Sequence, residues 1–120
     1  MVNLAERLAK YGTTLTCEDI PPEIMHRTKG LLVDTLGCAL GAYSSKPAMI
    51  ARTIACDVQQ SAMPAPIFGS GQQTSLELAT FANGVMIRYL DFNDGFAGIS
   101  RGGGHPSDIF APILTCAAAI

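Results

Sequence analysis

The sequence predicts an all-α protein, a helical bundle of about five helices. In five segments the apolar residues recur every three or four positions, which is the spacing of one face of a helix. The 120 residues are 48% hydrophobic, enough for one domain with its own core. A strand-like pattern is limited to the apolar pair Ile67 and Phe68, which could form a brief strand between prolines and glycines.

A short amphipathic helix is expected over residues 2–11. Leu4, Leu8 and Tyr11 have helical spacing there, and Gly12 follows at the position where a helix commonly ends. Glycine favours such an end because it adopts a left-handed backbone without steric cost.

The strongest helical pattern begins at Pro22, because proline suits a first helical turn, and runs to Tyr43. Its stripe consists of Ile24, Thr28, Leu31, Leu32, Leu36, Ala39, Leu40 and Tyr43. Each glycine inside this helix costs about 1 kcal/mol relative to alanine. We therefore expect a neighbouring helix to pack closely against them. These glycines are Gly30, Gly37 and Gly41.

A third helix is expected over residues 48–60, where Ile50, Ile54 and Val58 lie four residues apart. The following stretch reads mostly as a connection, because prolines and glycines punctuate it. Its Gly-Ser-Gly run lacks the longer glycine patterns that bind phosphate, so we interpret it as a turn.

A fourth helix is expected from Thr74 and Ser75, which can cap its first turn. One face carries Leu76, Ala79, Thr80, Asn83, Met86, Ile87 and Leu90. An Asn-Gly pair often forms a hairpin turn, but here the helical period continues on both sides of it. We therefore expect Asn83 to be a polar residue on a buried helix face.

The last helix is expected to start at Ile109, with Ser107 or Asp108 as its N-cap. It reaches Ile120 without a capping glycine or a polar run. We therefore expect the helical domain to continue beyond this segment.

Composition narrows the class of partner. The formal net charge is −2 and no cluster of lysine and arginine occurs, which argues against nucleic acid or an acidic membrane surface as partner. We expect no membrane span, because no apolar stretch approaches the length of a membrane-spanning helix. We expect no signal peptide, because residues 1–12 carry charges instead of an apolar run, and we expect a cytoplasmic location. The partner is then a small molecule or another protein.

The cysteines do not form a recognisable site. The four residues are Cys17, Cys38, Cys56 and Cys116, with no Cys-x-x-Cys pair among them. This spacing matches neither zinc binding nor a redox motif. We expect buried free thiols in a reducing compartment, because free cysteine packs like a small hydrophobic residue.

The candidate functional residues gather on a glycine-rich loop between the last two helices: Asp91, Asn93, Asp94, Ser100, Arg101, His105, Ser107 and Asp108. Asp91 at one helix end and His105 just before the next could converge on one anionic substrate. Imidazole can serve there as acid, base or cation. Alternatively, the aspartates are solvated turn residues or caps and His105 is ordinary loop polarity.

At this loop the sequence resembles a known family. The run ANGVMIRYLDFNDGF followed by GGGHPSD is similar to the MmgE/PrpD pattern of an Ala-Asn-Gly helix, an aspartate-rich turn and His-Pro-Ser-Asp. LLVDTLGCALGA and IFGSGQQTSLELATFANG also resemble that family. The resemblance implies that residues 1–120 are the N-terminal part of a helical domain, with later helices and a lid domain absent. It further implies lyase chemistry on a tricarboxylate or related acid, without a metal or an organic cofactor.

Carried over by position, the first aspartate of the family's turn is Asp91 and the histidine of its His-Pro-Ser motif is His105, and both resemble catalytic residues. We assign substrate binding to Asp94, Arg101 and Ser107. Gly95 stands where many relatives have a hydroxyl residue. The resemblance leaves dehydratase, decarboxylase and epimerase open.

Two hypotheses follow. In the first, the chain is a segment of a cofactor-independent lyase, inactive alone, that works with the rest of a protein, a complementing chain or a second copy in a dimer. A polycarboxylate needs several cationic or donor groups, and this loop offers few. In the alternative, the chain is a small non-catalytic helical interaction module, as its 15% charged residues and apolar end suggest.

Overall fold

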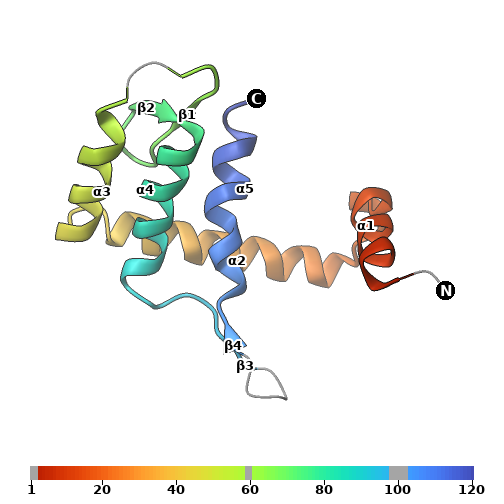
Figure 1. The fold of residues 1–120 in the computed structure, drawn as a ribbon. Coiled ribbons are helices and arrows are strands. Elements are labelled where there is room, and N and C mark those ends of the chain that lie inside the picture. The colour runs from red at the N-terminus through yellow and green to blue at the C-terminus, as the bar shows by residue number, and fades with distance from the viewer. Residues whose placement is uncertain (1–2, 59–60, 98–102) are drawn as a thin grey trace. The chain divides into compact units, whose positions relative to one another are not determined.

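A computed structural model describes residues 3–58, 61–97 and 103–120 (Figure 1). The chain divides into two compact units, residues 1–30 and residues 31–120, and each is described by itself. Five α-helices with two very short strand pairs in the described ranges confirm the predicted all-α class. No helix among these residues is long and apolar enough to cross a membrane.

The described elements are, in chain order, α1 (Leu4–Thr14), η1 (Cys17–Asp19), α2 (Pro22–Gly41), α3 (Lys46–Cys56), β1 (Pro64–Pro66), β2 (Gln73–Ser75), α4 (Leu76–Tyr89), β3 (Phe96–Ala97), β4 (Gly103–Gly104), η2 (Pro106–Ile109) and α5 (Phe110–Ala117). The two η elements are short 3₁₀ helices. Helix α2 begins at the predicted residue, whereas its end at Gly41 precedes the predicted one.

The first unit carries α1, whose start and end have local causes. Asn3 and Glu6 form a reciprocal capping box at its N-terminus. The predicted end at Gly12 is wrong, since the helix continues to Thr14. At its C-terminus the Leu15 N–H donates to the Tyr11 carbonyl at 3.0 Å, which gives a carbonyl of the last turn a partner.

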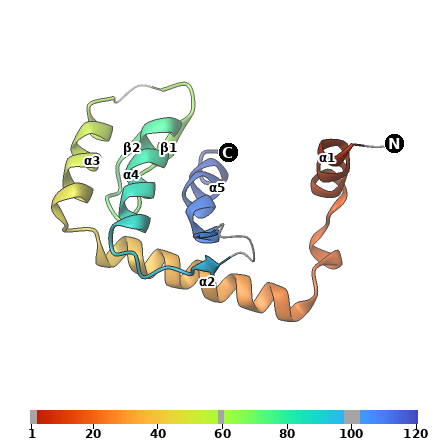
Figure 2. The ribbon, with the colours of Figure 1, turned by 60° about the horizontal axis from the view of Figure 1, so that its bottom comes forward.

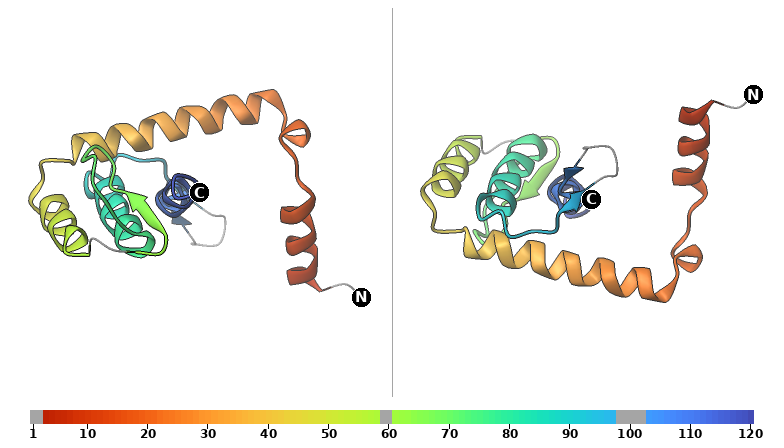
Figure 3. Two further views of the ribbon diagram at one scale, coloured as in Figure 1. Left: turned by 90° about the horizontal axis from the view of Figure 1, so that it is seen from above. Right: turned by 90° about the horizontal axis from the view of Figure 1, so that it is seen from below.

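In the second unit, α4 lies between α3 and α5 (Figures 2 and 3). The core is built mainly from alanines, which let the helices approach closely. Its members are Ala39, Ala48, Ala51, Ala55, Ala65, Ile67, Ala79, Ala82, Met86, Ile87 and Ala111. The β1–β2 hairpin stands at the start of α4 and the β3–β4 pair lies at the opposite end of the helices (Figure 1).

Helix α3 buries a face other than its most apolar one. The helix is capped by Ser45 and ends at Cys56, so it starts and stops earlier than predicted, and residues 59–60 lie outside the described ranges. Ile50 and Ile54 are 51% and 47% exposed. The residues packed into the core are instead the alanines of α3. Helix α3 packs against α4 through these small side chains, which let the two helices approach closely.

The α2 glycines only partly meet the expectation of close packing. A Cβ built on Gly41 would lie 3.1 Å from Leu90 Cδ1, at the end of α4. At Gly37, by contrast, a built Cβ would have no described neighbour within 4 Å, so the expectation is wrong for this residue. Within the described part of the second unit, α2 thus uses the glycine at its C-terminal end for a close approach.

The brief strand lies slightly earlier than predicted. Antiparallel pairs join Pro64 with Ser75 and Pro66 with Gln73, whereas Ile67 and Phe68 follow the strand. The Ile67 N–H still donates to the Gln72 carbonyl at 3.0 Å, which closes the turn. Of the two predicted caps of α4, Ser75 is the N-cap residue.

The expectation of a buried polar Asn83 is confirmed, since the residue is 0% exposed. Its Oδ1 accepts a hydrogen bond from the Phe68 N–H at 2.9 Å. Its Nδ2 donates to the Pro66 carbonyl at 3.1 Å and to Thr115 Oγ1 at 3.0 Å. One side chain of α4 thus binds the hairpin segment and α5 together.

The Gly-Ser-Gly run is a turn, as predicted, and two glycines in it have left-handed backbones. Replacing Gly69 (φ 73°) with alanine is expected to lower the free energy of unfolding by about 2 kcal/mol, because the new Cβ would also lie 3.2 Å from the Tyr43 ring. Gly71→Ala is the matched control: φ is 70° but nothing described lies within 4 Å. Urea unfolding of both variants measures the difference, and an equal loss in the two would contradict a role for Tyr43.

The cysteines are free, but only some are buried as expected. Cys38 is buried, and burial raises the pKa of its thiol, with a further contribution from the nearby Asp34 carboxylate. Cys17 and Cys116 are exposed, so the expectation of burial is wrong for them. A cysteine near apolar neighbours in sequence can still lie on the outer side of its helix.

Candidate active site

The loop after α4 begins at a backbone outlier. Asp91 has φ 55°, the one left-handed residue other than glycine among the described residues. Aspartate tolerates this region better than most residues because its short polar side chain can bond locally. Its N–H donates to the Arg88 carbonyl at 3.2 Å. The chain therefore turns sharply where α4 ends, with the Asp91 side chain at the corner.

The loop brings His105 to this aspartate. His105 Nδ1 lies 2.7 Å from the Asp94 carbonyl oxygen. Because a carbonyl only accepts hydrogen bonds, Nδ1 carries the proton and donates it. Nε2 then faces Asp91, with 3.7 Å to Asp91 Oδ1, a distance too long for a direct hydrogen bond. The structure thus brings together the two residues predicted to be catalytic.

Asp94 supports this arrangement from the loop. While its carbonyl accepts from His105, its Oδ1 accepts from the Ser107 N–H at 3.2 Å. Strands β3 and β4 pair just before His105 and hold the two ends of the loop together. The pairs are Phe96 with Gly104 and Ala97 with Gly103. Asp94 therefore orients His105 and fixes the start of η2.

Ser107 and Asp108 do not cap α5 as predicted. A 3₁₀ helix intervenes, so α5 starts at Phe110 with Ile109 as a cap that makes no side-chain hydrogen bond. Ser107 is 1% exposed, and its hydroxyl has no hydrogen-bond partner among the described residues. Asn93 is also buried, and neither its Oδ1 nor its Nδ2 has a hydrogen-bond partner in the described part of the chain. Buried polar groups without partners are uncommon and call for a ligand, a water or a neighbouring segment.

Arg88, which the sequence analysis did not single out, completes the cluster. It extends from the last turn of α4, with Nη1 2.9 Å from Asp91 Oδ1 and Nε 3.2 Å from Asp108 Oδ1. Nη1 is buried and makes no well-aligned hydrogen bond in the described ranges, so its contact with Asp91 is an ion pair. The i, i+3 spacing of Arg88 and Asp91 could have indicated this pair from sequence.

Two predicted loop residues, Ser100 and Arg101, lie outside the described residues. The substrate-binding assignment of Arg101 therefore stays a prediction. Within the described ranges, no group of three or more potential metal ligands gathers.

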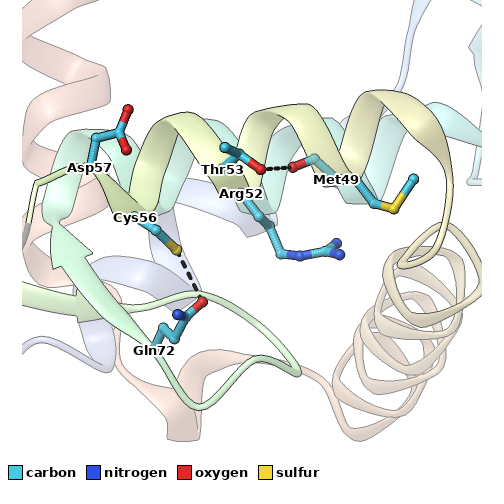
Figure 4. Close-up of a pocket in the computed structure, with 6 residues that line it drawn as sticks. All are labelled: Met49, Arg52, Thr53, Cys56, Asp57 and Gln72. Carbon is cyan, nitrogen blue, oxygen red and sulfur yellow. Dashed lines mark hydrogen bonds between the residues drawn. The ribbon is translucent and has the colours of Figure 1, made fainter.

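A separate hollow of about 450 Å³ lies along α3 (Figure 4). Its lining residues are Met49, Arg52, Thr53, Cys56, Asp57 and Gln72. The Arg52 guanidinium already donates to the Tyr43 carbonyl at 2.6 Å and lies 3.7 Å above the Tyr43 ring. Cys56 Sγ donates to Gln72 Oε1 at 3.0 Å. These groups are occupied by internal contacts, and none belongs to the loop cluster.

Comparison with known proteins identifies the family. A family model for the MmgE/PrpD N-terminal domain matches residues 6–120. The chain belongs to the MmgE/PrpD family. This finding confirms the resemblance to the family seen in the sequence. The matched residues include the aspartate-rich turn and the His-Pro-Ser-Asp motif.

Individual MmgE/PrpD relatives are named as dehydratases. An alkylcitrate dehydratase of Talaromyces stipitatus is 33% identical over 114 residues, covering 89% of this chain and 22% of the relative. A 2-methylcitrate dehydratase-like protein of Aspergillus oryzae is 35% identical, covering 80% and 19%. The 2-methylcitrate dehydratase of Escherichia coli is 36% identical, covering 72% and 17%. The chain spans about a fifth of the length of these curated relatives, and no solved structure matches it.

Proposed function

We propose that this chain is the N-terminal part of a hydro-lyase that removes water from 2-methylcitrate or a related tricarboxylate. The names of the MmgE/PrpD relatives support this reaction class. The observation that carries the proposal is the His105–Asp91 pair, whose Nε2 and Oδ1 atoms lie 3.7 Å apart beside an arginine. In the sequence, both residues stand at positions that resemble those of the family motif.

Dehydration of such an acid requires proton transfer and no redox partner. A C–H bond next to a carboxylate breaks and its electron pair forms the new C=C bond. The C–O bond of the neighbouring hydroxyl breaks, and the oxygen leaves as water after gaining a proton. His105 Nε2 is the imidazole atom free for proton exchange, because Nδ1 is engaged by Asp94. Asp91 can stabilise the imidazolium or accept a proton itself.

Substrate binding would use groups near this pair. The buried Ser107 hydroxyl has no hydrogen-bond partner among the described residues, which supports a ligand or another segment as its partner. Asp94 is engaged in holding His105 and Ser107, so we propose that it positions these residues instead of contacting substrate. Arg101 stays a proposed carboxylate ligand. A polycarboxylate needs further cationic groups, which we propose come from outside these residues, as expected if residues 1–120 are part of a larger helical domain or act with a partner chain.

The alternative, a helical interaction module, is supported by one different observation. Large apolar side chains are exposed on α1 and α3, including Leu4, Leu8, Ile50 and Ile54. Exposed apolar residues on one helix face commonly mark an association surface. A segment of a larger enzyme would expose such surfaces too. A measurement of catalytic activity therefore distinguishes the lyase hypothesis from the interaction module.

The test is an assay of the native polypeptide that carries this sequence. Purified protein is incubated with 2-methylcitrate, and the ultraviolet absorbance of the unsaturated product is followed together with carbon dioxide release. Water loss without carbon dioxide is the expected result. Carbon dioxide release would assign a carboxy-lyase instead. No turnover together with stable self-association would favour the interaction module.

A further inference from the structure

We propose that Arg88 is the positioning residue of this site and that it holds the Asp91 carboxylate opposite His105. The inference rests on the proposed function, because it concerns how the same site is organised. Asp94 already orients His105 through its backbone carbonyl. The contact with Arg88 supplies the corresponding constraint on the Asp91 carboxylate.

The first step is that one oxygen atom faces two basic groups. Asp91 Oδ1 lies 2.9 Å from Arg88 Nη1 and 3.7 Å from His105 Nε2. The Asp91 side chain is 66% exposed, so little packing restricts its rotamer. A freely rotating carboxylate would spend part of its time away from the imidazole. The ion pair with Arg88 selects the rotamer that points at His105.

The second step is that Arg88 is itself anchored on the other side of the loop. Its Nε lies 3.2 Å from Asp108 Oδ1, and Asp108 belongs to η2, which starts immediately after His105. Arg88 therefore connects Asp91, which follows the end of α4, to η2, which begins directly after His105. Lysine could not bridge both carboxylates equally well, because its ammonium is a single point charge while guanidinium offers donors in several directions.

The third step separates positioning from substrate binding. Arg88 Nη1 has almost no accessible surface, although the side chain as a whole is partly exposed. A substrate carboxylate could therefore not reach this nitrogen without displacing Asp91. Arg88 acts through Asp91, so its loss should lower kcat more than it raises KM.

The experiment is a double-mutant cycle in the native polypeptide, with dehydration of 2-methylcitrate as the readout. Arg88→Met is expected to lower kcat by about 10–100-fold and to change KM by less than about threefold, because misplacing a catalytic group costs turnover. In an Asp91→Asn background the same change should lower kcat by less than about threefold further, since the residue through which Arg88 acts is already disabled. Arg88→Lys should fall between wild type and Arg88→Met.

Arg52→Met is the matched control, because it removes another partly buried guanidinium that lies outside the loop cluster. Its kcat should equal that of wild type. Circular dichroism melting checks the fold of each variant, and if Arg88→Met does not fold, Arg88→Lys decides because it keeps the aliphatic stem and the charge.

Three results would overturn the inference while leaving the proposed function intact. These are full additivity of Arg88→Met and Asp91→Asn, a raised KM with unchanged kcat, or wild-type turnover in Arg88→Lys. Absence of dehydration by the wild-type protein would instead overturn the proposed function, and this inference with it.

Discussion

Replacing His105 with asparagine is expected to lower the kcat of the native polypeptide by about 10²–10⁴-fold while leaving its fold unchanged. The imidazole is the proposed proton-exchanging group of the site, and asparagine cannot take up a proton. Asparagine does retain an N–H donor for the Asp94 carbonyl, which His105 Nδ1 now contacts at 2.7 Å. Steady-state kinetics with 2-methylcitrate and circular dichroism measure the two parts of this prediction.

Asp91→Asn tests the carboxylate in the same assay. Asparagine tolerates the left-handed backbone at this position, where φ is 55°, so the change removes the charge without adding backbone strain. His26→Asn on α2 is the matched control, since His26 is the other of the two histidines in the chain and lies in the first unit. Wild-type turnover in both His105→Asn and Asp91→Asn would place the chemistry elsewhere.

The largest effect on stability is expected for Asn83→Ala, with a loss of about 3 kcal/mol in the free energy of unfolding. The change removes hydrogen bonds to the Phe68 N–H, the Pro66 carbonyl and Thr115 Oγ1. These partners are largely removed from solvent, so each would lose a hydrogen bond that water replaces poorly. Urea-induced unfolding followed by circular dichroism measures the loss.

Thr115→Val separates one arm of this network from the rest. Valine has nearly the same shape but removes the hydroxyl that Asn83 Nδ2 contacts and that donates to the Ala111 carbonyl at 2.7 Å. We expect a loss of about 1–2 kcal/mol, smaller than that of Asn83→Ala. Nearly unchanged stability in Asn83→Ala would show that water satisfies these groups and that the network is not a main support of the second unit.

Sequence reasoning succeeded where short-range physics decides the outcome. The helices, the turn at Gly69 and the buried position of Asn83 followed from apolar spacing and from residue preferences. Helix ends were less accurate, as at Gly12, where backbone hydrogen bonds such as that from Leu15 to Tyr11 carry the helix past the expected stop. The motif residues Asp91 and His105 were recognisable in the sequence and do lie near each other.

The sequence by itself therefore determined the helical class, the family and the two central residues of the candidate site. Only the tertiary structure decided that α3 buries its alanines and exposes Ile50 and Ile54, because the alanine face of α3 is the one that packs closely against α4. It also decided that Arg88 joins Asp91 to Asp108. Arg88 and Asp108 are 20 residues apart in the sequence. They come into contact only because the fold brings the end of α4 close to η2.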